Sequence, residues 1–266
     1  RIPFVAYVGT AHSLDSNFKS KVMNALFAAG TLRIYKKNPV LAKTSAAKEE
    51  LRQLGVPHAV IAPVGLDNAV LKKNIPADEK MRLRKEHGFE ADDVILCNVS
   101  RLSWEKRPLE LIDLFLQVKG KKKFKLIIVG NGPLEEELNE KIRKNGLEKE
   151  VKIYPNVPYE KMWEIYEMSD YYLNMNKGEI FGMAIMEAVY YKTSVAAIRA
   201  LGPSVTLKDM KGHKLCENDD EMAEWITGPY PSEKDLQESS EKMAATFTWD
   251  RCADAFLQAS SEKSSR

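Results

Sequence analysis

The chain has 266 residues, of which 44% are hydrophobic and 29% are charged, and its formal net charge is +2. This length suffices for one large domain or two smaller ones, and the even charge balance gives no case for a nucleic-acid partner. No apolar run reaches the roughly 18 residues that a membrane span requires. The three cysteines are scattered, which disfavours a disulfide framework or a structural zinc site and fits a reducing compartment. We therefore expect a cytoplasmic protein.

The first part of the chain predicts a small α/β unit. We expect strands at residues 3–8, 38–44 and 59–62, and helices at 17–29 and between Ser45 and Gly55. Ser45 is the expected N-cap of the latter helix, and Gly55 is expected to end it. The polar, lysine-rich residues 71–77 are the expected interdomain linker. Because the sequence starts at Arg1 with a strand-like run, we expect that an earlier portion of this unit is missing from it.

The second part alternates strands and helices. Strands are expected at residues 94–99, 124–129, 151–154, 171–175 and 194–198, and helices at 78–87, 108–118, 133–144, 161–168, 183–191, 220–227, 233–245 and 249–260. Apolar strands of this kind between helices indicate a parallel sheet that is covered on both faces. The fold class is therefore α/β.

A basic loop follows the strand at 94–99. Arg101 and Lys106 stand five residues apart in it, and ligands of open α/β sheets bind outside the carboxyl ends of the strands. Arginine offers a fork of donors to phosphate oxygens and lysine a mobile point charge, so both side chains suit a single anion. The alternative is a solvated basic loop.

The stretch from Glu179 to Glu187 joins a buried strand to an apolar helix. A strand, a glycine turn and a helix N-terminus form a ready anion site. Two carboxylates would repel that anion and are better explained as acceptors for several hydroxyl groups. The stretch thus predicts a nucleotide-sugar ligand; the alternative is an amphipathic helix with one exposed glutamate at each end.

Two further segments carry weaker signals. The segment from Gly130 to Glu135 begins like the dinucleotide fingerprint, but Glu135 stands where the third glycine is needed. We interpret it as a tight strand-to-helix turn near the ligand cleft, and a nicotinamide-dependent oxidoreductase is disfavoured. His12 follows the first strand and is either a polar contact to a substrate or part of a capped turn. No two histidines share metal-ligand spacing.

Taken in order, these segments resemble the family 4 (group 1) retaining glycosyltransferases of the GT-B fold. The resemblance rests on Arg101 with Lys106, on Gly130-Asn-Gly-Pro133 and on the glutamates 179 and 187 around Phe181-Gly182. Val64-Gly-Leu-Asp67 is similar to the turn before the second domain, and Thr248-Trp249-Asp250 to the start of the crossover helix. The resemblance implies two Rossmann-like units: residues 1–73 as the latter part of an acceptor-side domain, 74–247 as the complete donor-binding domain, and 248–266 as the crossover helix and tail.

The resemblance also implies roles for single residues. Arg101 and Lys106 would clamp the donor diphosphate, Glu187 would hold the ribose hydroxyls, and Glu179 would contact the transferred sugar. His12 matches the histidine that in this family points at that sugar. The remaining implied donor contacts are Phe181, Gly182, Met183, Gly130, Asn131, Gly132, Asn156 and Val157.

The implied activity is that of a retaining hexosyltransferase that moves a sugar from a nucleoside-diphosphate sugar, such as a UDP-sugar, to a glycan or lipid-linked acceptor. Lys192 and Ser194 replace a usual glycine and proline, and Leu201-Gly-Pro-Ser204 is similar to the branch that makes capsular or cell-surface polysaccharide. With arginine and lysine present and no acidic pair at a strand end, we expect no metal and no cofactor. The alternative is a nucleotide-sugar-binding module that is catalytically incomplete. The basic residues 119–125 predict a solvated loop or a peripheral contact with the inner face of the membrane.

Overall fold

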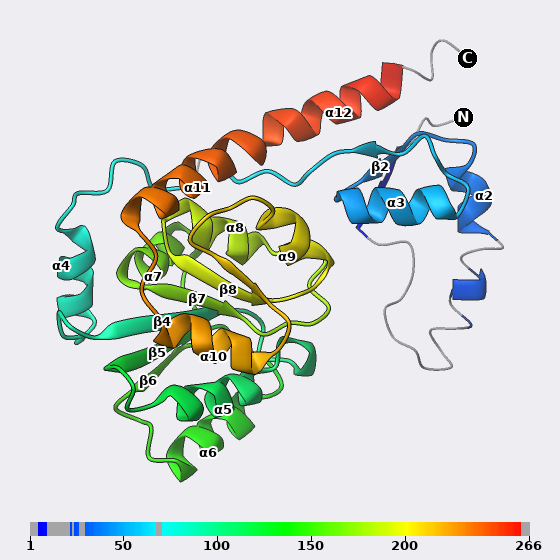
Figure 1. Ribbon diagram of the computed structural model, residues 1–266. Coiled ribbons are helices and arrows are strands. Elements are labelled where there is room, and N and C mark those ends of the chain that lie inside the picture. Colours follow the sequence, from blue (N-terminus) through cyan, green and yellow to red (C-terminus); the bar gives the residue numbers. More distant parts are fainter. Residues whose placement is uncertain (1–4, 10–21, 23, 27–29, 68–70, 262–266) are drawn as a thin grey trace. The chain divides into compact units, whose positions relative to one another are not determined.

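The computed structural model describes residues 5–9, 22, 24–26, 30–67 and 71–261 (Figure 1). The chain divides into two compact units, one formed by residues 1–67 and 246–266 and the other by residues 68–245. We call them unit 1 and unit 2. His12 and most of the helix expected at 17–29 lie outside the described residues. The predicted domain limits at residues 73 and 247 stay a proposal.

Unit 1 is a small parallel sheet between helices. Its strands are β1 (Ala6–Val8), β2 (Val40–Ala42) and β3 (Val60–Ile61), in the order β1-β2-β3, and its helices are α2 (Thr31–Tyr35), α3 (Ser45–Gln53) and α12 (Trp249–Ser261). Neighbouring residues of a strand point to opposite faces. Val40 and Ala42 therefore pack with Leu51 of α3, whereas Leu41 packs with Cys252 and its neighbours on α12.

The start of α3 corrects one expectation. Thr44, not Ser45, is the N-cap: it has extended backbone angles, and its buried Oγ1 accepts a hydrogen bond from the backbone N–H of Ala47 at 3.0 Å. Ser45 is the first helical residue. The helix ends at Gln53, and Gly55 then adopts a left-handed conformation with φ of 80°. The cap satisfies one of the free N–H groups of the first turn.

Unit 2 contains a six-stranded parallel sheet in the order β6-β5-β4-β7-β8-β9. The strands are β4 (Val94–Val99), β5 (Phe124–Val129), β6 (Val151–Tyr154), β7 (Tyr171–Asn174), β8 (Ser194–Ile198) and β9 (Lys214–Cys216). From β4 the chain runs outward through β5 and β6, and it then returns to β7 on the other side of β4. The sheet therefore reverses its direction of growth between β4 and β7, which is the place where such folds bind ligands.

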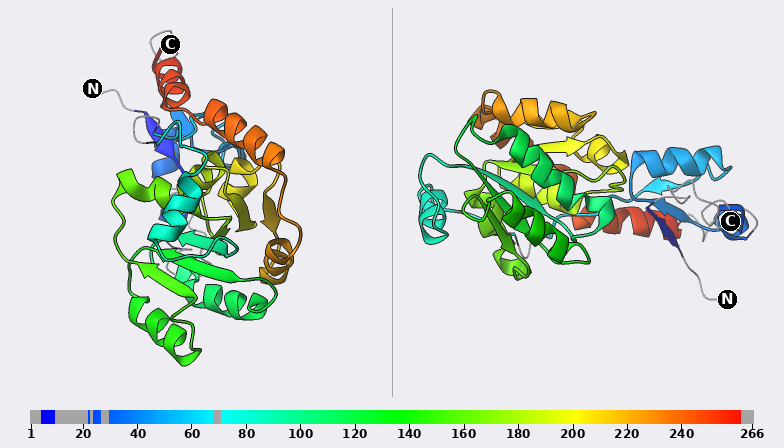
Figure 2. Two further views of the ribbon diagram at one scale, coloured as in Figure 1. Left: turned by 90° about the vertical axis from the view of Figure 1, so that its left-hand side faces the viewer. Right: turned by 90° about the horizontal axis from the view of Figure 1, so that it is seen from below.

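Helices cover both faces of this sheet (Figures 1 and 2). The helices described in this part of the chain are α4 (Glu79–Glu86), α5 (Pro108–Val118), α6 (Glu135–Lys144), α7 (Met162–Met168), α8 (Met183–Tyr190), α9 (Leu201–Thr206), α10 (Asp219–Thr227) and α11 (Glu233–Thr246), with short 3-10 turns at Trp104–Lys106 and Tyr159–Lys161. One face packs against α5, α6 and α10 in a single apolar core. On the other face, α7 contacts β4 and α8 contacts β8. Strands buried on both faces explain the continuous apolar runs of the sequence.

A buried ionic cluster joins α4 to the N-terminal ends of β4 and β7. Arg84 is buried; it donates to Oδ2 of Asp170 at 2.7 Å and to the carbonyl oxygen of Met168 at 3.0 Å. Lys80 reaches the other carboxylate oxygen of Asp170 at 2.9 Å, and the N–H of Ile95 donates to Oδ2 at 2.8 Å. We call these side chains the Asp170 cluster. Such a paired, fully hydrogen-bonded charge is costly to disrupt.

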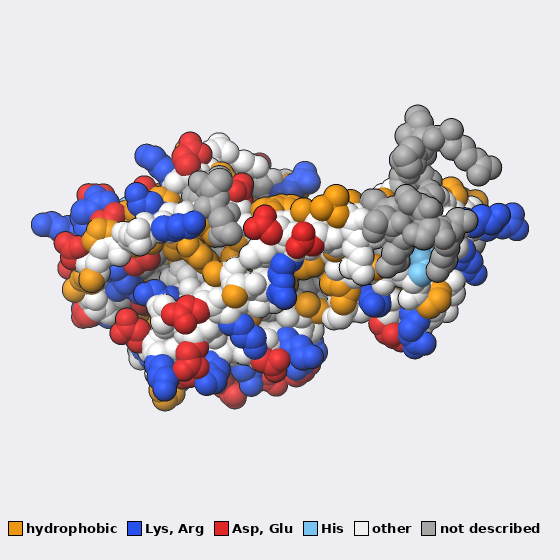
Figure 3. Space-filling view, turned by 90° about the horizontal axis from the view of Figure 1, so that it is seen from above, with side chains coloured by type: hydrophobic (Ala, Val, Ile, Leu, Met, Phe, Trp, Pro, Cys, Tyr) orange, Lys and Arg blue, Asp and Glu red, His pale blue; other side chains and the backbone are white. Residues whose placement is uncertain are grey.

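On the face that Figure 3 shows, charges of both signs are interspersed, as the small net charge leads one to expect. Within the basic residues 119–125, Lys122 is only partly exposed, and its ammonium donates to the carbonyl oxygens of Ile226 at 3.1 Å and Gly228 at 2.6 Å, at the end of α10. Of the helices within the described ranges, none combines the length and apolar character needed to cross a membrane.

Candidate functional site

The site residues predicted from sequence lie, His12 aside, in the loops that leave the carboxyl ends of four adjacent strands or in the helix that follows one of them. Asn156 and Val157 follow β6, Gly130 to Gly132 follow β5, Arg101 and Lys106 follow β4, and Glu179, Phe181, Gly182, Met183 and Glu187 follow β7. Because all the strands are parallel, these loops share one edge of the sheet.

An ion pair connects the loop after β4 with the loop after β7, at the point where the order of the strands reverses. Nζ of Lys106 lies 2.9 Å from Oε2 of Glu179, and the two side chains are 25% and 16% exposed. Asn176 donates to the same carboxylate oxygen at 3.1 Å. Burial, the largest influence, raises the pKa of Glu179, but the hydrogen bonds and the charge of Lys106 outweigh it, so the pKa lies below its ordinary value. The carboxylate is therefore ionised at neutral pH.

The loop between β7 and α8 is shaped by its own side chains. Oδ1 of Asn174 accepts from the N–H of Asn176 at 3.0 Å, and Oδ1 of Asn176 accepts from the N–H of Gly178 at 2.9 Å. Gly182 then takes a left-handed conformation, with φ of 87°, and a Cβ there would lie 2.8 Å from Cδ1 of Ile185. Among the described residues no side chain caps the start of α8, so its first N–H groups are left without a side-chain partner and could bind an anion.

The loop after β4 is held by Arg107. This residue has the left-handed φ of 55°, and its guanidinium makes paired hydrogen bonds to the carboxylate of Asp219 at 3.0 and 2.7 Å. It also donates to the carbonyl oxygen of Met175, at the end of β7, at 3.4 Å. The neighbouring Lys106 is thereby fixed beside Glu179. Arg101, at the start of the loop, is exposed, and within the described residues its side chain makes no hydrogen bond.

The Gly130-Asn-Gly132 turn packs directly on the loop of Arg101. A Cβ at Gly130 would lie 2.0 Å from the carbonyl oxygen of Ser100, and one at Gly132 would lie 2.4 Å from that of Leu102. The N–H of Leu102 donates to the carbonyl oxygen of Asn131 at 2.9 Å. Only glycine permits this approach. The turn thus supports the loop after β4, whatever else it contacts.

The side chain of Asn131 points to the next loop of the same edge. Its Nδ2 donates to Oδ1 of Asn156 at 3.0 Å and to the carbonyl oxygen of Pro155 at 3.2 Å. The loops after β5 and β6 are therefore joined by side chains that could also turn towards a ligand.

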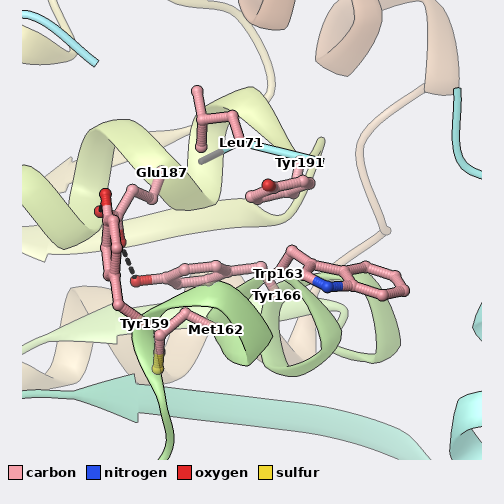
Figure 4. Close-up of a pocket in the computed structure, with 7 residues that line it drawn as sticks. All are labelled: Leu71, Tyr159, Met162, Trp163, Tyr166, Glu187 and Tyr191. Atoms are coloured by element: carbon pink, nitrogen blue, oxygen red, sulfur yellow. Dashed lines mark hydrogen bonds between the residues drawn. The ribbon is translucent and has the colours of Figure 1, made fainter. Parts of the chain in front are cut away.

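Glu187 lies in a small aromatic pocket (Figure 4). The residue is only 8% exposed; Oε2 accepts a hydrogen bond from the hydroxyl of Tyr166 at 2.7 Å, and Oε1 accepts one from Tyr159 at 3.1 Å. Burial raises the pKa of Glu187, and the two hydroxyls offset part of that rise. Neither Glu179 nor Glu187 is exposed, so the alternative of an amphipathic helix with an exposed glutamate at each end is wrong.

The buried Tyr172 of β7 lies within reach of the charges of both carboxylates. Its hydroxyl donates to the carbonyl oxygen of Val99, the last residue of β4, at 3.3 Å. Burial raises the pKa of Tyr172 well above its ordinary value, and the charges of Glu179 and Glu187 both raise it further. Both carboxylates therefore lie within electrostatic range of the strand end from which the loop of Arg101 departs.

Sequence reasoning missed several supporting groups. Asn176 and the two tyrosines that hold Glu187 were not singled out, and the tyrosines lie 21 and 28 residues from Glu187 in the sequence, with no local pattern that joins them to it. The helix α9 was also missed; the N–H of its Gly202 donates to the carbonyl oxygen of Glu179 at 2.8 Å. Among the residues that the structure describes, no group of three His, Cys, Asp or Glu side chains could hold a metal ion.

Comparison with known proteins identifies the family to which the sequence is similar. The sequence model described as "Glycosyl transferases group 1" matches residues 79–243. The D-inositol 3-phosphate glycosyltransferase of Mycobacterium avium is 26% identical over 288 aligned residues, which cover 95% of this chain and 63% of that protein. The amylovoran biosynthesis glycosyltransferase AmsD of Erwinia amylovora is 34% identical over 112 residues, which cover 42% of this chain and 31% of that protein. The chain thus spans only 63% and 60% of the length of two such relatives.

Solved structures support the same fold. Alr3699/HepE of Anabaena, solved in complex with UDP and glucose, is similar with a TM-score of 0.77 and 19% identity, covering 99% of this chain and 72% of that one. Sucrose-phosphate synthase of Thermosynechococcus elongatus has a TM-score of 0.80 and 16% identity, and the match covers 98% of this chain and 68% of that one. The fold of this chain is α/β of the GT-B type, and the chain belongs to the group 1 glycosyl transferases.

Proposed function

We propose that the protein transfers a sugar from a nucleoside-diphosphate sugar to a glycan or lipid-linked acceptor, as a family 4 enzyme that retains the anomeric configuration and needs no metal ion. The observation that carries the proposal is the pair of Lys106 and Glu179 at the reversal point of the sheet, beside the uncapped start of α8. A cation, an anion-binding helix end and a hydroxyl acceptor are the three groups that such a donor requires.

Glycosyl transfer breaks the bond between the anomeric carbon and a phosphate oxygen, and negative charge grows on the departing diphosphate. Fixed cations aimed at that charge lower the barrier, and losing one such donor typically costs about 3–4 kcal/mol. We assign this role to Lys106 and Arg101. When the donor binds, Lys106 turns from Glu179 to the phosphates, and Glu179 accepts hydroxyls of the transferred sugar in its place. The N–H groups of Phe181, Gly182 and Met183 complete the anion site.

The nucleoside lies along the same edge in this proposal. Glu187 accepts the ribose hydroxyls, because an ionised carboxylate only accepts hydrogen bonds and its Oε1 faces the partly exposed Tyr159. Asn131, Asn156 and Val157 flank the base. His12, which is outside the described residues, is assigned to the transferred sugar. We place the reaction in cell-surface or capsular polysaccharide synthesis at the inner face of the membrane, which the relative named for amylovoran biosynthesis supports.

Calorimetry with UDP and GDP tests the donor site. We expect the wild-type protein to bind one of them, and Lys106→Met to weaken that binding roughly tenfold to 100-fold, as expected for a lost hydrogen bond to a charged group. Lys177→Met removes an exposed lysine of the β7–α8 loop and is the matched control. Wild-type affinity in Lys106→Met would refute the assignment.

A turnover assay tests the chemistry. We expect transfer or slow hydrolysis of the matching nucleotide-sugar to continue in excess EDTA. Turnover that EDTA abolishes and manganese restores would refute metal independence. Nucleotide binding without any turnover, with acceptors supplied, would instead favour the binding module that is catalytically incomplete.

A further inference from the structure

We propose that the Tyr159 hydroxyl is an exchangeable occupant of the donor site, which holds the place on Glu187 that a ribose hydroxyl takes, whereas Tyr166 is a permanent positioning residue for the same carboxylate. This inference rests on the proposed function, because it needs a nucleotide ribose at Glu187. It assigns opposite effects to two tyrosines that make the same kind of hydrogen bond (Figure 4).

Tyr166 is fixed from all sides. Its side chain is 1% exposed, and its ring stacks on that of Tyr191 with a centroid distance of 5.9 Å and an interplanar angle of 10°. The ring of Tyr172 lies on another side, with a centroid distance of 6.2 Å. The carbonyl oxygen of Tyr166 accepts from Oγ1 of Thr193 at 2.9 Å. The hydroxyl of Tyr166 can therefore only orient Oε2 of Glu187, at 2.7 Å.

Tyr159 is placed differently. It starts a short 3-10 turn, its side chain is 46% exposed, and its bond to Oε1 of Glu187 is the longer one, at 3.1 Å. The pocket behind the carboxylate, between Leu71, Trp163 and Tyr191, holds only about 10 Å³, which is the room for roughly one water. The cavity is too small to take up a tyrosine ring, and the 46% exposure of Tyr159 leaves the outward direction, to solvent, open to it.

The exchange is chemically balanced. Glu187 is buried and needs hydrogen-bond donors in order to stay ionised, which the Tyr159 hydroxyl supplies. A ribose diol offers two hydroxyl donors in the place of one. The turn that carries Tyr159 begins two residues after Val157, which we assign to the base. A nucleoside that enters therefore meets the turn and the hydroxyl together, and the diol takes Oε1 as the ring moves away.

Two isosteric variants separate the roles. Tyr159→Phe removes the competitor, so we expect whichever of UDP and GDP binds the wild type to bind this variant roughly threefold to tenfold more tightly. Tyr166→Phe removes the orienting bond, so we expect binding roughly tenfold weaker. The 2′,3′-dideoxy form of the same nucleotide cannot displace Tyr159 from Glu187, and we expect it to bind Tyr159→Phe and the wild type equally. Thermal melting checks that Tyr166→Phe remains folded.

The outcomes distinguish the two proposals. If the wild type binds and Tyr159→Phe binds equally or more weakly, Tyr159 is a permanent partner and the inference is overturned, while the donor site stands. An equal gain with the dideoxynucleotide would also overturn it, since the effect would not pass through the ribose. If the wild type binds neither nucleotide, the proposed function fails and the inference fails with it.

Discussion

Replacing Lys106 by methionine should reverse the direction in which the pKa of Glu179 is shifted. In the wild-type protein the hydrogen bond and the charge of Lys106 outweigh the burial that raises this pKa. Without the lysine only the asparagine donors oppose burial, and the carboxyl is left 16% exposed with no cation beside it. We therefore expect the pKa of Glu179 to rise above its ordinary value of 4.5 in Lys106→Met.

The size of the effect follows from the geometry. Two unit charges at the 2.9 Å of this pair attract each other by about 6 kcal/mol at an effective dielectric constant of 20, before desolvation is subtracted. Removing one partner of a fully buried pair costs about 3–5 kcal/mol. Because a quarter of the Lys106 side chain is exposed, we expect a loss of about 2–3 kcal/mol in the free energy of unfolding at pH 7.

The loss should depend on pH with a definite sign. In the wild type the folded-state pKa of Glu179 lies below that of the unfolded chain, so its contribution is present above pH 4.5 and is lost as the pH falls through the folded-state value. In the variant the folded-state pKa is raised, so the penalty appears as the pH rises through 4.5 to that value. The difference between the two proteins is therefore largest at pH 7 and shrinks towards pH 5.

Urea unfolding at a series of pH values between 5 and 7 measures this difference. Lys177→Met is the control, and we expect it to lie within about 0.5 kcal/mol of the wild type throughout, because its side chain is exposed. A difference between Lys106→Met and wild type that stays constant over the whole pH range would refute the reasoning, since it would mean that the lysine does not stabilise the ionised form of Glu179.

Three further predictions concern stability. Asp170→Asn leaves the buried Arg84 without its counter-charge, and urea unfolding should show a loss of about 3–5 kcal/mol, with nucleotide affinity unchanged in the folded protein. Burial lowers the pKa of His213 to about 4. Between pH 8 and pH 4 the free energy of unfolding of the wild type should therefore fall by about 3 kcal/mol more than that of His213→Asn. Parallel curves of unfolding free energy against pH would contradict this. In thermal unfolding, Gly132→Ala should lower the free energy of unfolding by more than about 2 kcal/mol, because the added Cβ would meet a carbonyl oxygen at 2.4 Å. Gly120→Ala, where the added Cβ would meet nothing within 4 Å, should lower it by about 1 kcal/mol. Equal losses would show that the close approach at Gly132 is unimportant.

The strands of unit 2 could be predicted from the sequence because burial on both faces makes each one an unbroken apolar run. β4, β5, β6 and β8 begin and end at the predicted residues. The elements that were missed are short: α9 has six residues and β9 has three, and neither is long enough to show a period. Their positions depend on the sheet that they pack against.

In the candidate site, too, some features could be predicted from the sequence and others could not. That Arg101 and Lys106 lie at a strand end followed from the loop between an apolar strand and a helix. The partners of Glu187 could not be inferred, because Tyr166 and Tyr159 are 21 and 28 residues away and meet it only once α7 has packed on α8. The pairing of Lys106 with Glu179 spans 73 residues and requires the strand order, in which β7 lies beside β4.

The Asp170 cluster and the pair of Lys106 and Glu179 lie at opposite ends of the same two strands, β4 and β7. The end at which buried charges stabilise the domain therefore shares no side chain with the end at which we propose that the donor binds. Because the two groups share no side chain, a substitution in the loops at one end leaves the stabilising contacts at the other end in place.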